Sequence, residues 1–163
     1  MIKKNKLEII YGAEIAQKVL QANVLVVGAG GIGCELVKCL SMTGFSKLSV
    51  IDLDTIDISN LNRQFLFRRH HVDMPKSRTL KESICTQNPK IVISDYIGRI
   101  QEDRFSFTFF KDFNIVINAL DNDEARNYVN SMCFNLDIPL VEAGTSGYQA
   151  TCVAIKKGTT QCY

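Results

Sequence analysis

The stretch that decides the fold is N-V-L-V-V-G-A-G-G-I-G, residues 23–33. It begins with a short, valine-rich apolar run that ends at a glycine, which is typical of a buried strand. The overlapping residues I-G-C-E-L-V-K-C-L, at 32–40, carry apolar side chains at helical spacing. The stretch therefore predicts a strand, a tight turn and a helix.

Strands and helices continue to alternate along the chain. Further strands are predicted at 47–52, 90–96, 113–118, 139–143 and 150–155, and helices at 75–88, with Pro75 in first position, and at 123–136. This alternation predicts an α/β, Rossmann-like fold in which a mostly parallel sheet carries helices on both faces. Residues 1–163 are expected to form one domain, with residues 1–21 as a helical lead-in.

Composition narrows the class of protein. The 19 basic and 17 acidic residues give a net charge of only +2, which indicates neither a nucleic-acid nor a membrane partner. No apolar run reaches the roughly 18 residues of a spanning helix, and the first residues lack a signal-peptide core. The six cysteines, Cys34, Cys39, Cys85, Cys133, Cys152 and Cys162, form no C-x-x-C pair. They suit a reducing compartment, so we expect an intracellular protein.

The glycine turn, G-A-G-G-I-G at 28–33, lies where this spacing carries meaning, because a strand precedes it and a helix follows. Gly28 permits the turn, Gly30 lets the backbone approach a phosphate, and Gly33 lets the helix pack closely on the strand. Asp52 ends the next predicted strand, where its carboxylate can accept hydrogen bonds from a ribose. These features indicate an adenine nucleotide and leave NAD, S-adenosylmethionine and ATP open.

The loop at 54–74 is long, polar and irregular, and loops of that length are more often functional than idle. This loop leaves the carboxyl end of a strand beside the nucleotide crevice, where Arg63 can bind a phosphate bidentately. The alternative is a solvated turn, with residues 65–67 packed back into the core. Lys76, at the start of the next helix, either completes a cationic clamp or is an ordinary surface lysine.

A further aspartate lies in N-A-L-D-N, residues 118–122, at the end of the fourth predicted strand. Asp121 offers a carboxylate at that end, which suits a metal shared with phosphates. Alternatively Asp121, Asn122 or Asp123 caps the helix that follows.

Four stretches together resemble a known family: G-A-G-G-I-G-C-E-L, L-D-T-I-D-I-S-N-L-N-R-Q-F-L-F, N-A-L-D-N-x-x-A-R and E-A-G-T-S-G-Y. They are similar to the adenylation domain of the enzymes that activate ubiquitin and ubiquitin-like proteins. This ThiF/MoeB-like domain is related to the bacterial activators of sulfur-carrier proteins. The terminal I-K-K-G-T-T-Q-C-Y most resembles the branch that serves SUMO, whereas the loop string is shared with the ubiquitin and NEDD8 branches.

The resemblance implies a reaction and its site. In such enzymes the C-terminal carboxylate of the modifier attacks the α-phosphate of ATP, with Mg²⁺, and a cysteine later takes the acyl group as a thioester. Arg63, Lys76 and Asp121 are the expected catalytic residues, with Asp121 as the Mg²⁺ ligand. The resemblance places the following residues at the nucleotide: Gly28, Ala29, Gly30, Gly31, Ile32, Gly33, Asp52, Asn60, Leu61, Asn62, Arg63, Lys76, Leu120, Asp121, Asn122 and Arg126. Arg126 has a solvated surface position as its alternative.

The resemblance also implies that the chain is the N-terminal part of a longer protein and inefficient alone. The thioester cysteine is expected in a separate domain, and Cys162 is expected to be the first ligand of a structural Zn²⁺ site completed beyond Tyr163. Expected partners are SUMO, a second adenylation-like subunit in a heterodimer and a conjugating enzyme, in the nucleus, the cytoplasm or both. The alternatives are the ubiquitin or NEDD8 branch, an NAD-dependent oxidoreductase and a non-catalytic scaffold subunit.

Overall fold

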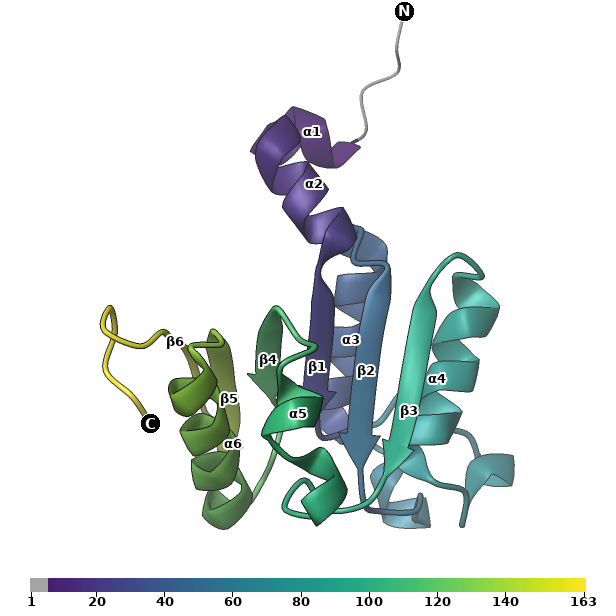
Figure 1. Ribbon diagram of the computed structural model, residues 1–163. Coiled ribbons are helices and arrows are strands. Elements are labelled where there is room, and N and C mark those ends of the chain that lie inside the picture. The colour runs from purple at the N-terminus through teal and green to yellow at the C-terminus, as the bar shows by residue number, and fades with distance from the viewer. Residues whose placement is uncertain (1–5) are drawn as a thin grey trace, which may run out of the picture.

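The computed structural model describes residues 6–163, with a six-stranded sheet at its centre (Figure 1). The strand order is β3-β2-β1-β4-β5-β6. The strands are β1 (Asn23–Val27), β2 (Lys47–Asp52), β3 (Val92–Ile97), β4 (Ile115–Asn118), β5 (Leu140–Ser146) and β6 (Gln149–Ile155). All neighbouring pairs are parallel except β5 with β6, which is antiparallel. The predicted mostly parallel α/β fold is confirmed.

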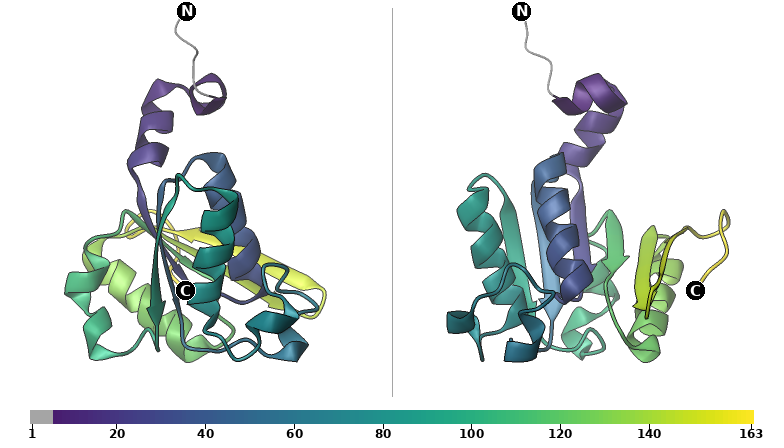
Figure 2. Two further views of the ribbon diagram at one scale, coloured as in Figure 1. Left: turned by 90° about the vertical axis from the view of Figure 1, so that its right-hand side faces the viewer. Right: turned by 180° about the vertical axis from the view of Figure 1, so that it is seen from behind.

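Helices cover both faces of the sheet (Figure 2). The side chains of each strand alternate between these faces, so each face buries its apolar side chains under its own helices. On one face, Val24 and Val26 of β1 pack into a core with α3 (Gly31–Thr43) and α4 (Lys76–Gln87). On the other, Leu25 and Val27 pack with α5 (Phe107–Phe110) and α6 (Asp123–Leu136). Strand β1 is therefore buried on both faces, as its continuous apolar sequence predicts.

Several element boundaries differ from the sequence prediction. Helix α4 begins at Lys76, and Pro75 is its extended N-cap residue, so the prediction of proline in first position was wrong by one residue. The 3₁₀ helix η3 (Asp103–Phe105) and α5 were not predicted, because the segment shows no clear periodicity; an aromatic cluster that includes Phe105, Phe109 and Phe113 holds them together.

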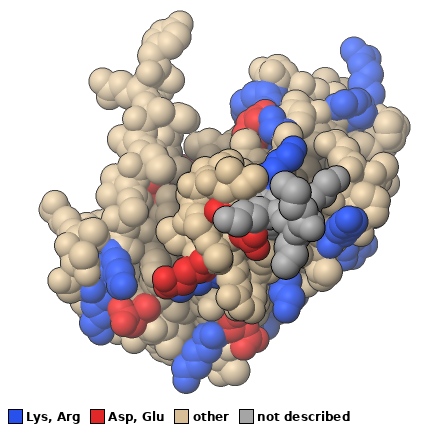
Figure 3. All heavy atoms as spheres, turned by 90° about the horizontal axis from the view of Figure 1, so that it is seen from above, with Lys and Arg blue, Asp and Glu red and all other residues tan. Residues whose placement is uncertain are grey.

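The described part of the lead-in forms two helices, α1 (Lys6–Tyr11) and α2 (Ala13–Gln21), which project beyond the start of β1 (Figure 1). Residues 1–5 of this lead-in lie outside the described part of the chain. Seen from that end of the molecule, acidic and basic side chains are interspersed without a large field of one sign (Figure 3). No helix within residues 6–163 combines the length and the apolar character that crossing a membrane requires.

The strand order fixes where a ligand can bind. From β1 the chain moves outward through β2 to β3, and then returns to place β4 on the opposite side of β1. The crevice where the order reverses lies at the carboxyl ends of β1 and β4, where Val27 pairs with Asn118. In open α/β sheets this switch point is the usual ligand site.

Candidate functional site

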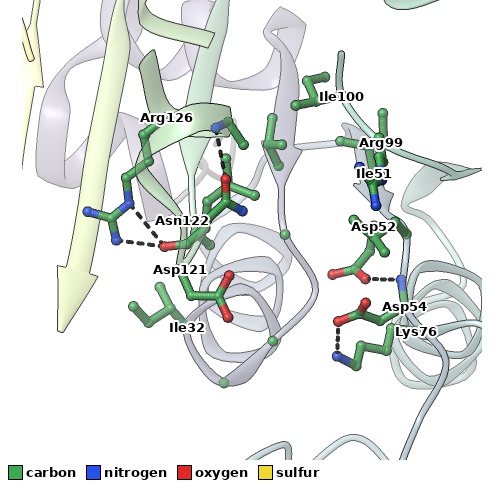
Figure 4. Close-up of a pocket in the computed structure, with 18 of the residues that line it drawn as sticks. Ile32, Ile51, Asp52, Asp54, Lys76, Arg99, Ile100, Asp121, Asn122 and Arg126 are labelled. Carbon is green, nitrogen blue, oxygen red and sulfur yellow. Dashed lines mark hydrogen bonds and ion pairs between the residues drawn. The ribbon is translucent and has the colours of Figure 1, made fainter. Parts of the chain in front are cut away.

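A cavity of about 660 Å³ lies at this switch point, within the roughly 300–1,000 Å³ typical of small-molecule sites. Figure 4 shows its walls, which come from the ends of β1, β2, β3 and β4 and from the segments that follow them. Its charged lining residues are Asp52, Asp54, Arg63, Lys76, Arg99, Asp121, Glu124 and Arg126. Acidic and basic groups are thus balanced, so the arrangement of the groups rather than the net charge determines what binds.

The glycine turn forms the floor of the cavity. Gly28 has a φ of 106°, and a Cβ there would clash with the carbonyl oxygen of Ala119 on the neighbouring β4 segment. A Cβ on Gly33 would clash with the carbonyl oxygen of Gly28, which confirms the predicted close packing of α3. At Gly30 a Cβ would meet no heavy atom within 4 Å, so this part of the backbone faces open space in the cavity.

Asp52 connects the floor to β2. Its Oδ2 accepts a hydrogen bond from the backbone amide of Ala29 at 2.6 Å, and its Oδ1 accepts one from the amide of Asp54 at 2.8 Å. Burial raises the pKa of Asp52, although these two hydrogen bonds oppose the increase. A carboxylate has about four acceptor positions, so Asp52 holds the glycine turn and keeps capacity for a ribose hydroxyl.

The loop after β2 packs into the core and also contributes to the cavity. Ile56, Leu66 and Phe67 are buried, and this packing into the core does not keep the loop from lining the cavity. The exposed Arg63 lines the cavity while its Nη1 donates to the carbonyl of Ser59 and to Oδ1 of Asn62, both at 3.1 Å. The stem of this side chain lies beside the glycine turn, because a Cβ on Gly31 would come within 3.7 Å of Cγ of Arg63.

Part of the expected nucleotide set lies away from the cavity wall: Ala29, Gly33, Asn60, Leu61 and Asn62. Asn60 is buried, and its carboxamide oxygen accepts a hydrogen bond from the amide of Asp57 at 3.0 Å. Reciprocal bonds between the two residues close a short 3₁₀ helix, η1 (Ile58–Asn60). In this structure Asn60 therefore shapes the loop that carries Arg63 and does not reach the cavity itself.

Lys76 is buried, with 7% of its surface exposed. Its Nζ donates to Oδ2 of Asp54 at 2.7 Å, and both residues line the cavity (Figure 4). Because Lys76 is buried, the alternative of an ordinary surface lysine is wrong. Its backbone amide also bonds the carbonyl of Asp54, which holds the start of α4 against the loop. The sequence did not point to Asp54, which lies 22 residues before its partner.

Asn122, and not Asp121, caps α6. The Oδ1 of Asn122 accepts a hydrogen bond from the amide of Ala125 at 2.8 Å. Asp121 is exposed, its carboxylate points into the cavity toward Lys76 (Figure 4), and within the described residues it makes no hydrogen bond or ion pair. The capping alternative therefore fails for Asp121, which is left available to a ligand.

Arg126 is not a solvated surface residue, so that alternative is also wrong. Its Nε and Nη2 donate to the carbonyl of Leu120 at 3.2 and 2.6 Å, and its Nη1 lies 3.5 Å from Oε1 of Glu142. The guanidinium forms part of the cavity wall beside Leu120. Sequence reasoning missed Glu142 as the partner of Arg126 because Glu142 lies on β5, whereas Arg126 lies on α6.

Other lining residues were also missed. Arg99 and Ile100 reach the cavity from the turn after β3, at the same edge as Asp52. Gln64 lines the cavity with only 2% of its surface exposed, and its Oε1 has no hydrogen-bond partner among residues 6–163. The only available signal for Arg99 was its position at the end of a parallel strand, where loops carry function.

The cysteines are poor nucleophiles or lie away from this cavity. Burial raises the pKa of Cys34 and of Cys133 to about 12, which makes both thiols inert. Cys152 is exposed because β6 is an edge strand. Cys162 is exposed, and no group of three or more His, Cys, Asp or Glu among the described residues is arranged to hold a metal ion.

The chain is similar to several known proteins. The profile of the ThiF family matches residues 3–163. SUMO-activating enzyme subunit 2 of Dictyostelium discoideum is 49% identical over 152 residues, covering 93% of this chain and 23% of that protein. The NEDD8-activating enzyme E1 catalytic subunit of Schizosaccharomyces pombe is 39% identical over 155 residues, covering 92% and 34%. The crystal structure of E. coli MccB with ATP superposes with a TM-score of 0.83 at 26% identity, covering 98% of this chain and 52% of that one.

Proposed function

The chain belongs to the ThiF family, and we propose that it is the nucleotide-binding part of an ATP-dependent enzyme that activates a ubiquitin-like modifier. One observation carries this proposal: the Asp121 carboxylate, unpaired within the described residues, points into the cavity toward Lys76 (Figure 4), and Arg63 lines the same cavity. Polyphosphate with a divalent cation needs this combination of a hard oxygen ligand and fixed cations. The chain spans only 23% and 34% of the two relatives described above, so the complete activity belongs to the longer proteins.

The proposed nucleotide is ATP. The turn at Gly30 leaves open space beside the start of α3, where backbone amides attract an anion. The neighbouring structure of E. coli MccB contains ATP in a fold that superposes on this chain. An NAD-dependent oxidoreductase would share the glycine turn and Asp52, but it would leave the buried Lys76 and the free Asp121 without a role.

The proposed reaction is adenylation of the modifier. A carboxylate oxygen of its C-terminal glycine forms a bond to the α-phosphorus of ATP, while the bond from that phosphorus to the bridging oxygen of the β-phosphate breaks. The products are an acyl-adenylate and pyrophosphate. An anionic nucleophile approaches a polyanion here, so Arg63 and Lys76 lower the barrier by stabilising charge on the phosphate oxygens.

Asp121 fits a Mg²⁺ site of the kind that nucleotides complete. Mg²⁺ is usually held by one or two carboxylates together with phosphate oxygens and water, rather than by a cage of protein ligands. The absence of a three-residue metal cluster among the described residues agrees with that arrangement. When bound, Mg²⁺ would neutralise phosphate charge.

The proposed modifier is SUMO. The relative named as a SUMO-activating subunit is more similar to this chain than the one named as NEDD8-activating. Because that relative is called subunit 2, we also propose a heterodimer with a second subunit. Transfer to a conjugating enzyme, the thioester cysteine and a Zn²⁺ site beginning at Cys162 would depend on the remainder of the longer protein. A non-catalytic scaffold subunit would have no need of the free Asp121 and the buried Lys76.

Calorimetric titration of ATP and of NAD into the full-length enzyme with its partner subunit, with and without Mg²⁺, tests the proposal. We expect ATP to bind more tightly with Mg²⁺ than without it, and Asp121→Ala to abolish this difference without lowering the melting temperature. NAD binding that is indifferent to Mg²⁺ would refute the proposed function. An Asp121→Ala enzyme that melts early and still binds Mg²⁺ and ATP would refute the role of Asp121.

A further inference from the structure

A buried polar network lies behind the wall that carries Asp121. Asn118 at the end of β4 is paired with Glu142 of β5 in the sheet register, and its Nδ2 donates to Oε2 of Glu142 at 2.7 Å. Asn118 is completely buried, and Glu142 is only 4% exposed. The Oε1 of Glu142 lies 3.5 Å from Nη1 of Arg126 and has no hydrogen-bond partner in the part of the chain that the structure describes. None of the proposed chemistry requires this buried carboxylate.

The network ends at the backbone beside Asp121. Two nitrogens of Arg126 donate to the carbonyl oxygen of Leu120, which immediately precedes Asp121 (Figure 4). Gly144 makes room for this arrangement, because a Cβ at that position would come within 2.6 Å of Nη2 of Arg126. The guanidinium is therefore confined between a backbone carbonyl, a glycine and a buried carboxylate.

Stability alone is a weak reason for such a pair. Removing two charges from water costs free energy that their attraction often fails to recover, and apolar replacements of buried ion pairs are frequently neutral or stabilising. A charged pair does, however, favour one orientation of the guanidinium over others. In this position the orientation of Arg126 determines where the Leu120 carbonyl and the next residue lie.

We propose that Glu142 is a positioning residue that acts through Arg126: it holds the guanidinium against the carbonyl of Leu120 and thereby fixes the Asp121 carboxylate at the cavity wall. This inference rests on the proposed function in so far as Asp121 is the Mg²⁺ ligand. Residues that orient metal ligands without touching the metal typically affect metal affinity or activity 10- to about 100-fold. Glu142 would belong to that class.

The test compares Glu142→Gln and Arg126→Lys with Asp95→Asn in the full-length enzyme and its partner subunit. Asp95 is a matched control, because its partly buried carboxylate on β3 pairs with Lys81 and Arg78 of α4 and lies away from the cavity. The readout is the Mg²⁺ concentration that half-saturates ATP–pyrophosphate exchange. We expect it to rise about tenfold in Glu142→Gln and Arg126→Lys, the lower end of the outer-sphere range. Asp95→Asn should match the wild type.

ATP binding without Mg²⁺ separates positioning from a general structural role. It should be unchanged in Glu142→Gln, because the floor and the loop after β2 remain intact. Loss of Mg²⁺-free binding by the same factor would overturn the proposal, since Glu142 would then support the cavity as a whole. Half-saturation equal to that of the wild type would overturn it as well.

A second measurement is independent of the proposed function. Amide hydrogen exchange of the peptide covering residues 119–124, in the enzyme without nucleotide, reports directly on the hold over this turn. We expect several-fold faster exchange in Glu142→Gln and Arg126→Lys than in Asp95→Asn. Unchanged exchange would overturn the positioning role. If the wild type used no ATP while Glu142→Gln still exchanged faster, the proposed function would fail and the hold on the turn would stand.

Discussion

The two walls of the cavity satisfy their charged groups in different ways. In the loop wall, formed by Asp54, Arg63, Gln64 and Lys76, each cation already has an oxygen partner: Lys76 bonds Asp54, and Arg63 bonds Ser59 and Asn62. The turn wall consists of residues 120–126. Here Asn122 and Arg126 bond backbone groups of the same wall, whereas Asp121 has no partner within the described residues. The loop wall thus holds its cations in fixed positions, whereas the turn wall carries a carboxylate that is free to bind a metal.

The largest expected effect lies in the loop wall. Arg63→Ala should slow adenylation on the order of 10²-fold, the usual scale for removing a group that stabilises transition-state charge. Because Arg63 is exposed, the melting temperature should hardly change. ATP–pyrophosphate exchange in the full-length heterodimer measures this effect, and an unchanged exchange rate would remove Arg63 from the catalytic set.

The ion pair of the loop wall should matter for stability as well. Lys76 has a side chain only 9% exposed, whereas that of Asp54 is 53% exposed. Asp54→Ala leaves the buried ammonium without its acceptor, so it should lower the free energy of unfolding by about 1–3 kcal/mol, the cost of an unsatisfied buried group. Urea unfolding measures this change. Asp112→Ala is the control, because it removes an exposed carboxylate that makes no side-chain hydrogen bond or ion pair within the described residues.

The cap in the turn wall should have a smaller effect. Asn122→Ala removes the acceptor for the amide of Ala125 and should lower the free energy of unfolding by about 1 kcal/mol. Asp121→Ala should leave that free energy unchanged while it abolishes Mg²⁺-dependent binding. If Asn122→Ala and Asp121→Ala melted alike, the assignment of the two neighbours to capping and metal binding would be wrong.

The sequence predicts the frame of this site better than its pairings. Local patterns were sufficient for the glycine turn and for the helix at 123–136, whose observed bounds are the predicted ones. The pairs Lys76 with Asp54 and Arg126 with Glu142 join residues far apart in the chain, so only the folded sheet brings them together. The side chain of Asn60 lies within its loop and not at the cavity, because its oxygen bonds the nearby backbone amide of Asp57. The resemblance alone could not show that outcome.

The smallest expected effect is a pH dependence from the network behind the turn wall. Burial raises the pKa of Glu142 above its ordinary 4.5, against the opposing influence of Asn118 and Arg126. The folded chain therefore keeps this proton to higher pH than the unfolded chain does. Between the two pKa values the folded state binds more protons, so the free energy of unfolding falls as pH rises.

Glu142→Gln should remove that decrease, and urea unfolding at a series of pH values above 4.5 measures it. Asp95→Asn should act in the opposite sense and at lower pH. Hydrogen bonds and charges from Lys81 and Arg78 outweigh burial and lower the pKa of Asp95 below 3.8, so its wild-type carboxylate adds stability as pH rises through that range. An identical pH profile for the wild type and Glu142→Gln would mean that the buried carboxylate has the same pKa in the folded chain as in the unfolded chain. The contrast between the two walls would then rest on geometry alone.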